Sequence, residues 1–355
     1  MRKFKPFTLI ILLLVITPLL AQETVMNIGH RGTGTNAPGN DFPENTIPSF
    51  VHAFLEGADM VELDVLLTSD DQVIVIHDAT LDRTTDCTGP VIDITLSEIK
   101  QCDAAWGTPL QGTGVEVPTL AEVFDAVDGP INVEIKSDHV GGTYTAAHIA
   151  ERVLTVIADA GAAARVVISS FSLDVCAAVK TLAPALPVAY LTSELNVNAE
   201  IDKVIAAGLD GIHPYGLQTF AANVTYAHDN GLFVNVWTID PAALMQTMIT
   251  RGVDGVITNE PDVLAEVLAD DDTVDDDTVD DDTSDDDTTD DDTVDDDTLD
   301  DDTADDDTTD DDAVDDDAID DDAVDDDAAD DDTTDDDAAP DGDDDDDDDD
   351  SGCGS

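Results

Sequence analysis

The sequence predicts an α/β protein: a (β/α)8 TIM barrel with a small insertion after the second strand, plus a disordered acidic C-terminal tail. From residue 131 onward, six short apolar runs alternate regularly with helical patterns, as the buried strands of a parallel sheet do. With two earlier strands this gives eight units in about 250 residues, the usual length of an α/β barrel. A doubly wound open sheet is the alternative arrangement of the same elements.

The expected strands are short and rich in Val and Ile. They cover residues 25–29, 60–66, 131–136, 166–171, 188–192, 211–213, 233–238 and 255–258. An additional strand at 73–77 follows the second strand after a tight polar turn, so these two should form an antiparallel hairpin. Residues 79–117 lack periodicity and are expected to form the insertion, with a short helix near residues 96–102.

The expected helices fill the connections between these strands. The first runs through Glu56, with Asn45 or Thr46 as its cap and Pro48 in its first turn. The others cover residues 118–127, 144–159, 172–182, 198–207, 219–229 and 241–250.

The first 21 residues are typical of a signal peptide. Three basic residues precede the apolar run Thr8–Leu20, and Ala21 is a suitable last residue before cleavage. The run is shorter than the roughly 20 residues that a membrane span needs, although the bulky Leu19 leaves an uncleaved anchor as the alternative. We therefore expect an exported protein (periplasmic, cell-surface or extracellular) with no stable membrane span after signal removal.

The charge of the chain is concentrated in its C-terminal part. From Asp270 onward the sequence holds 51 of the 85 acidic residues and no Lys or Arg, and the formal net charge is −73. Such a segment cannot bury a core, so residues 269–355 should be a disordered Asp-rich repeat tail after a domain at 22–268. The charge argues against nucleic acid as a partner. The tail suits a solvated spacer with weak Ca²⁺ binding, and Cys353 near its end is a candidate for surface attachment.

Export would place the cysteines in an oxidising compartment. Cys87 and Cys102 flank one loop-like segment of the insertion and could pair. Cys176 lies in a helical pattern and is expected to be a buried thiol. The spacings match no C-x-x-C metal pattern.

Three acidic residues on two strands suggest a metal site. Glu62 and Asp64 alternate with Val61, Leu63 and Val65, so their side chains point to the same face of the strand. Glu134 lies on the 131–136 strand, and together these carboxylates suit Ca²⁺ or Mg²⁺. For Glu62 and Asp64 alone, an edge strand with an acidic face in water is the alternative.

Basic residues and histidines complete a candidate catalytic set at the strand ends. Arg31 and Lys136 could bind an anion beside the metal. His30 and His77 could act as general acid and base. A metal, cations and two histidines at the C-terminal ends of barrel strands suit phosphodiester hydrolysis.

Many separate motifs in the chain resemble the glycerophosphodiester phosphodiesterase family. They span about residues 25–268, and the segments are His30-Arg31-Gly32, Pro43-Glu44-Asn45-Thr46, Glu62-Leu63-Asp64, His77-Asp78, Leu81-Asp82-Arg83-Thr84-Thr85, Pro118-Thr119-Leu120, Asn132-Val133-Glu134-Ile135-Lys136, Trp237-Thr238 and Gly252–Pro261. The resemblance implies a TIM barrel that hydrolyses glycerophosphodiesters to sn-glycerol 3-phosphate and an alcohol.

The resemblance also implies roles for individual residues. It places Ca²⁺ or Mg²⁺ on Glu62, Asp64 and Glu134, and acid–base catalysis on His30 and His77. The substrate-binding positions that it implies are Arg31, Glu44, Asn45, Lys136 and Trp237. Two alternatives remain open: a catalytically inactive surface or Ca²⁺-binding display protein, and a phospholipase D-like enzyme acting on lysophospholipids.

Overall fold

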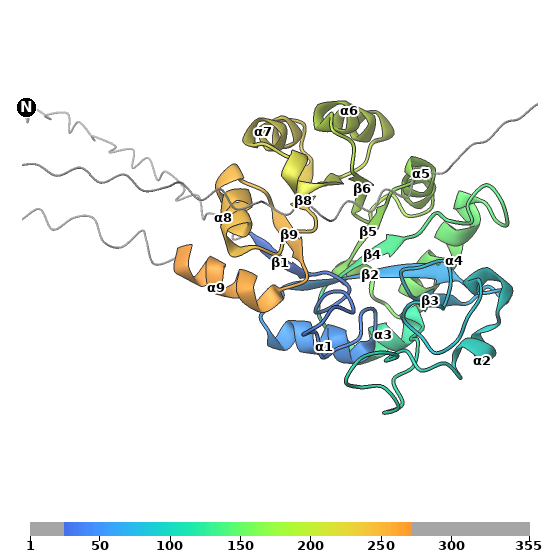
Figure 1. Cartoon of the computed structure of the whole chain (residues 1–355). Helices are drawn as coiled ribbons and strands as arrows, with labels where there is room; N and C mark the ends of the chain where they lie inside the picture. The colour runs from blue at the N-terminus through green and yellow to red at the C-terminus, as the bar shows by residue number, and fades with distance from the viewer. Residues whose placement is uncertain (1–24, 272–355) are drawn as a thin grey trace, which may run out of the picture. The chain divides into compact units, whose positions relative to one another are not determined.

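The computed structural model describes residues 25–271, in which eight parallel strands close into a barrel (Figure 1). The strands are β1 (Met26–Gly29), β2 (Met60–Leu67), β4 (Ile131–Ile135), β5 (Val166–Ser170), β6 (Val188–Thr192), β7 (Gly211–Pro214), β8 (Phe233–Val236) and β9 (Gly255–Thr258). This confirms the predicted TIM barrel and excludes the open sheet. The expected signal peptide, the tail beyond Asp271 and Cys353 lie outside the described residues.

The barrel closes where the first strand meets the last. β1 pairs with β9 on one side, with Ile28 opposite Ile257, and with β2 on the other. The short strand β3 (Val73–Val75) runs antiparallel to β2, with Val65 opposite Val75. The predicted hairpin is therefore confirmed.

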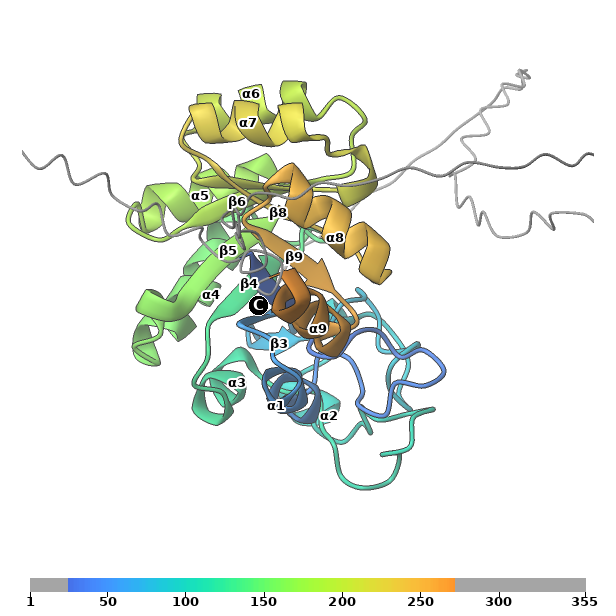
Figure 2. The ribbon, with the colours of Figure 1, turned by 90° about the vertical axis from the view of Figure 1, so that its left-hand side faces the viewer.

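The helices surround the strands (Figure 2). They are α1 (Ile47–Leu55), α3 (Leu120–Ala126), α4 (Ala146–Asp159), α5 (Leu173–Leu182), α6 (Val197–Ala207), α7 (Ala221–Asp229), α8 (Ala242–Arg251) and α9 (Pro261–Asp271). Side chains of Thr119, Ser172 and Asn196 cap three of them. The sequence predicts no helix after the last strand, so α9 is an addition.

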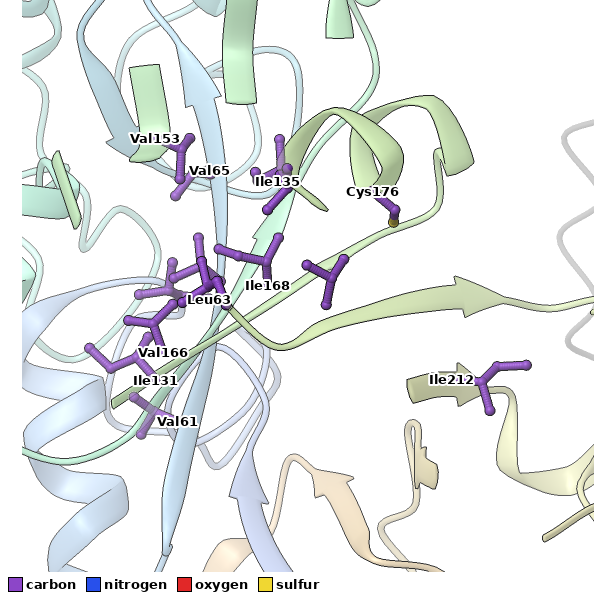
Figure 3. Close-up of a cluster of buried hydrophobic side chains, with 14 of the residues drawn as sticks. Val61, Leu63, Val65, Ile131, Ile135, Val153, Val166, Ile168, Cys176 and Ile212 are labelled. Carbon is purple, nitrogen blue, oxygen red and sulfur yellow. The ribbon is translucent and has the colours of Figure 1, made fainter. Parts of the chain in front are cut away.

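The main core lies between the outer face of the sheet and the helices. Val61, Leu63 and Val65 are fully buried there, and Ile131 and Ile168 pack with them (Figure 3). Because side chains alternate along a strand, Glu62 and Asp64 point to the opposite face, the interior of the barrel.

The insertion forms a smaller core of its own. It contains α2 (Leu96–Ile99) and a 3₁₀ turn at Val91–Asp93, and Leu81, Val91 and Ile99 are buried in it. A disulfide between Cys87 and Cys102 links two positions within the insertion. Cys176 is a buried free thiol, and burial raises its pKa to about 12. No helix within residues 25–271 is both long and apolar enough to cross a membrane.

Candidate active site

Three buried carboxylates meet inside the barrel near the C-terminal ends of β2 and β4. Glu62, Asp64 and Glu134 each offer an oxygen atom, and these atoms lie within 4.8 Å of one another. The register explains the meeting, because Asp64 and Glu134 are Cα partners on neighbouring strands. All three residues are at most 8% exposed, so the acidic-face alternative for Glu62 and Asp64 is excluded.

The protonation of the three carboxyl groups is uneven. Burial and the neighbouring charge of Asp64 raise the pKa of both Glu62 and Glu134 above the ordinary carboxyl range. Burial also acts against ionised Asp64, but the cations Lys136 and Arg31 outweigh it and hold the pKa of Asp64 below its usual range. Glu62 and Glu134 therefore need a further positive charge to be ionised together.

Arg31 and Asn45 approach the carboxylates with unusual backbone conformations. Their φ angles are 51° and 57°, in the left-handed region, where strain concentrates at functional sites. The Arg31 backbone N–H donates to Glu62 Oε2 over 3.0 Å, and the Asn45 amide donates to Asp64 Oδ2 over 2.8 Å. The acidic cluster thus holds Arg31 through its backbone and Asn45 through its side chain.

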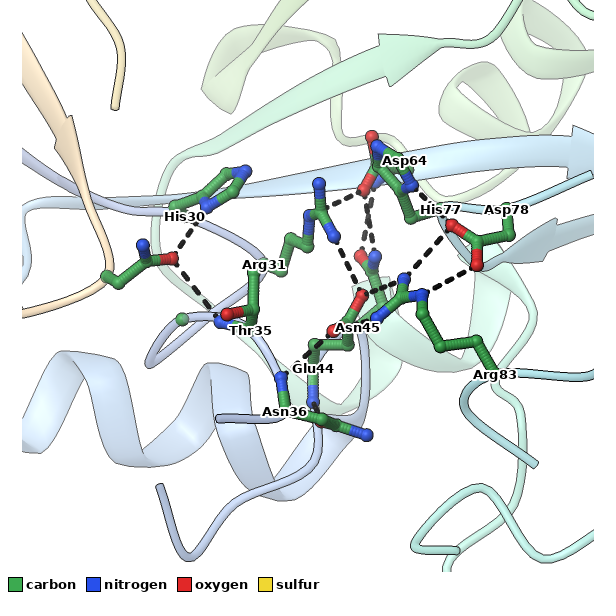
Figure 4. Close-up of polar contacts among 12 residues, drawn as sticks. His30, Arg31, Thr35, Asn36, Glu44, Asn45, Asp64, His77, Asp78 and Arg83 are labelled. Atoms are coloured by element: carbon green, nitrogen blue, oxygen red, sulfur yellow. Dashed lines mark hydrogen bonds and ion pairs between the residues drawn. The ribbon is translucent and has the colours of Figure 1, made fainter. Parts of the chain in front are cut away.

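Glu44 lies between two arginines. Arg31 Nη1 donates to its Oε1 over 2.8 Å, and Arg83 donates to both of its oxygens over 2.8 Å (Figure 4). Its carboxylate also accepts the backbone N–H of Asn36. Burial would raise the pKa of Glu44, but the hydrogen bonds and charges of the two arginines lower it.

His30 is oriented by a neutral amide. Its Nδ1 lies 2.7 Å from Asn259 Oδ1, which also accepts the backbone N–H of Thr35. Asn259 Nδ2 in turn donates to Asp240 over 2.9 Å, which fixes the amide orientation. His30 Nδ1 is therefore the protonated nitrogen, and Nε2 carries the lone pair. Burial of the ring and the charge of Arg31 lower the pKa of His30 to about 4, so the ring is neutral near pH 7.

His77 is oriented by a carboxylate. Its Nδ1 lies 2.7 Å from Asp78 Oδ1, and Arg83 binds the same carboxylate through Nε and Nη2. The hydrogen bond from His77 outweighs partial burial, and together with Arg83 it holds the pKa of Asp78 below its usual range. Asp78 is thus an anion beside the imidazole.

A cavity of about 160 Å³ opens among these groups. Seven of the ten expected site residues line it: His30, Arg31, Glu62, His77, Glu134, Lys136 and Trp237. Lys136 Nζ lies 2.9 Å from Glu134 Oε1. Trp237 donates its indole N–H to the carbonyl of His213 and packs edge-on against Phe171, so one side of the cavity is apolar.

The structure changes the interpretation of Glu44 and Asn45. Neither lines this cavity; Glu44 is occupied by the arginines and Asn45 by Asp64. Both side chains contact other side chains of the site, and their substrate-binding roles stay predictions. Asn45 also does not cap α1, and the hydroxyl of Thr46 instead donates to Pro43 O.

Four further residues orient this set without a role predicted from the sequence, namely Asp78, Arg83, Asp240 and Asn259. Asp78 directly follows His77, and Asn259 follows the last strand, so the strand-end criterion could have found these two. Asp240 follows β8 by four residues and carries no local signal.

The donor set fits a divalent cation. Three clustered carboxylates match the all-oxygen ligands that Ca²⁺ and Mg²⁺ prefer. Burial and the neighbouring carboxylate charge raise the pKa of Glu62 and Glu134, and a bound cation would favour their ionised forms.

Comparison with known proteins identifies relatives of this chain. Residues 30–263 match the model of the "Glycerophosphoryl diester phosphodiesterase family". A glycerophosphodiester phosphodiesterase of Caldanaerobacter subterraneus is 36% identical over 244 residues, covering 68% of this chain and 96% of that protein. One of Bacillus altitudinis is 34% identical over 240 residues, covering 66% and 94%. The crystal structure of glycerophosphodiester phosphodiesterase from Agrobacterium tumefaciens superposes with a TM-score of 0.57 at 26% identity, covering 68% of this chain and all of that one.

Proposed function

The chain belongs to the glycerophosphoryl diester phosphodiesterase family and is a phosphoric diester hydrolase, and from that premise we propose that it is an exported, metal-dependent enzyme. Its substrates would be glycerophosphodiesters, which it converts to sn-glycerol 3-phosphate and an alcohol. The proposal rests on one observation: the cavity is lined by two differently oriented histidines, two cations and two carboxylates, and the third carboxylate, Asp64, is clustered with those two.

Arg31 and Lys136 would bind the phosphodiester. Both side chains line the cavity, and both are already charged, because neighbouring carboxylates outweigh burial and raise their pKa. A Ca²⁺ or Mg²⁺ ion on Glu62, Asp64 and Glu134 would supply further charge to the phosphoryl oxygens. The two side chains can thus place the phosphorus atom between the histidines.

The two histidines would divide acid and base catalysis. His30 is neutral, with its Nε2 lone pair available, and would take the proton from the attacking hydroxyl group. His77, whose Nδ1 is paired with the carboxylate of Asp78, would give its Nε2 proton to the departing alkoxide. The attacking group is a water molecule or the neighbouring hydroxyl of the glycerol moiety.

Export is supported by the disulfide. A Cys87–Cys102 bond persists in an oxidising compartment and is rare in the cytosol, in keeping with the expected signal peptide at 1–21. For residues 269–355 the simplest role is a solvated spacer. Attachment through Cys353 predicts a modified C-terminus, and mass spectrometry of the cell-surface form showing an unmodified end would exclude it.

The central test measures sn-glycerol 3-phosphate release from glycerophosphocholine by the purified protein. Ca²⁺, Mg²⁺ and a chelator are compared, beside the variant His30→Ala. We expect release that needs metal and is lost in the variant. No release from several glycerophosphodiesters by folded, metal-bound protein would favour the inactive display protein, and release only from lysophospholipids would favour the phospholipase D-like alternative.

A further inference from the structure

Two neutral polar side chains that the mechanism above does not use line the cavity, Thr238 and Asn132, and of these two only Asn132 has a buried polar atom without a partner. Asn132 lies on β4, two residues before Glu134, and is the Cα partner of Glu62. Its side chain lines the cavity but is only 1% exposed. It therefore lies level with Glu62 and deeper in the barrel than Glu134.

Only one end of the Asn132 side-chain amide has a hydrogen-bond partner. Its Nδ2 donates to Ser169 Oγ on β5 over 3.1 Å, while its Oδ1 is buried and has no hydrogen-bond partner among residues 25–271. Buried polar atoms nearly always have a partner. A group that enters the cavity and can hydrogen-bond would supply the missing one.

The other side chains that line the cavity indicate which kind of ligand group could pair with Asn132. Its charged side chains are those that hold the metal, the phosphate or the transferred protons. The remaining lining is mainly apolar and comes from Phe171, Leu191, Trp237 and Ile257. A ligand part that suits both Asn132 and these apolar side chains carries C–H groups and neutral hydroxyls, as the glycerol moiety does.

We propose that Asn132, oriented by Ser169, hydrogen-bonds a hydroxyl of the glycerol moiety and thereby selects glycerol-bearing phosphodiesters. The proposal rests on the proposed function and names the residue that recognises the substrate's polyol part. A buried hydrogen-bonding group discriminates strongly, since an analogue without the hydroxyl leaves it unpaired. A hydroxyl both donates and accepts, so it can pair with either end of the amide.

A binding measurement tests the proposal without requiring turnover. Calorimetry compares sn-glycerol 3-phosphate with n-propyl phosphate, which has the same charged group but no hydroxyl, on the metal-loaded full chain. We expect the parent protein to bind the glycerol compound at least about tenfold more tightly. Equal affinities in the parent protein would overturn the proposal.

Two variants locate the preference. Asn132→Leu, of similar volume, should bring the two affinities within about twofold of each other. Ser169→Ala, which leaves the amide but removes its orienting partner, should retain part of the preference. A preference that survives unchanged in Asn132→Leu overturns the assignment to this residue.

Two controls separate recognition from a structural or metal-related role. Ca²⁺ affinity and melting temperature should be the same in Asn132→Leu as in the parent, and an equal loss of both phosphate ligands with weaker Ca²⁺ binding would contradict the proposal. In kinetics, kcat/KM for glycerophosphocholine should fall about a hundredfold in Asn132→Leu. A parent that binds selectively but does not hydrolyse glycerophosphocholine refutes the proposed function alone.

Discussion

The two halves of the candidate active site orient their histidines in opposite ways. His30, at the end of β1, is paired with the neutral amide of Asn259, which is 229 residues away in the sequence. His77, at the start of the insertion, is paired with the carboxylate of the next residue, Asp78. An amide fixes the position of a proton without stabilising positive charge on the ring, whereas a carboxylate does both. The difference indicates that the two histidines are not interchangeable.

The largest expected effect separates the base from the acid. His30→Ala should lower kcat/KM about a thousandfold for any leaving group, because the nucleophile loses its base. His77→Ala should cost about as much with glycerophosphocholine but less than about tenfold with a p-nitrophenyl diester, whose leaving group needs no proton. Steady-state kinetics with both substrates measures this, and an equal loss on both in His77→Ala would contradict the assignment.

A second, smaller effect tests the orienting partners. Asp78→Asn and Asn259→Leu should each lower kcat about 10- to 100-fold, as loss of a residue that orients a functional histidine does. Only Asp78→Asn should largely spare the p-nitrophenyl diester, because Asp78 orients the histidine whose proton that leaving group does not need. Equal losses on that substrate in the two variants would contradict the difference between the two histidines.

A third prediction concerns the carboxylates between the two histidines. The raised pKa of Glu62 and Glu134 means that metal-free folded protein binds more protons than the unfolded chain just above the ordinary carboxyl range. Stability from these groups is therefore lost as pH rises through their folded pKa. We expect the melting temperature of chelator-treated protein to fall as pH rises through this range, and added Ca²⁺ to remove the trend. A trend unaffected by metal would place its origin elsewhere.

The smallest effect on catalysis is expected from the disulfide on the His77 side. Cys87→Ser/Cys102→Ser opens a link between positions 15 residues apart and should cost about 3 kcal/mol of stability, with activity largely kept. Chemical denaturation with and without reductant measures the cost. The matched control is Cys176→Ala, whose response to reductant should equal that of the parent.

The sequence predicts the barrel and the acidic cluster for simple physical reasons. Short Val- and Ile-rich runs mark buried parallel strands, and the two-residue spacing of Glu62 and Asp64 places them on one face. His77 and Asp78 are adjacent, so that pair could also have been found. α9 was missed because its pattern leads directly into the acidic repeat.

Other features of the site depend on the folded barrel and its loops, and the local sequence does not indicate them. The pairing of His30 with Asn259 exists only because β1 and β9 are neighbours. Glu44 is acidic and belongs to a site motif, but whether a carboxylate faces a substrate or two arginines is decided by the loops around it. Asn132 resembles any polar residue in a strand until its unpaired atom is seen beside the cavity.

The β1–β9 pairing has a consequence for how the enzyme matures. Contacts between distant parts of a chain form late and slowly in folding. The pairing of β1 with β9 is such a contact, because it joins the first strand to the last. The carboxylates on β2 and β4 can assemble earlier, but His30 acquires its partner Asn259 only when the ring of strands closes. A chain truncated before β9 therefore leaves His30 without Asn259, and under the proposed function the base is oriented in the same event that completes the fold.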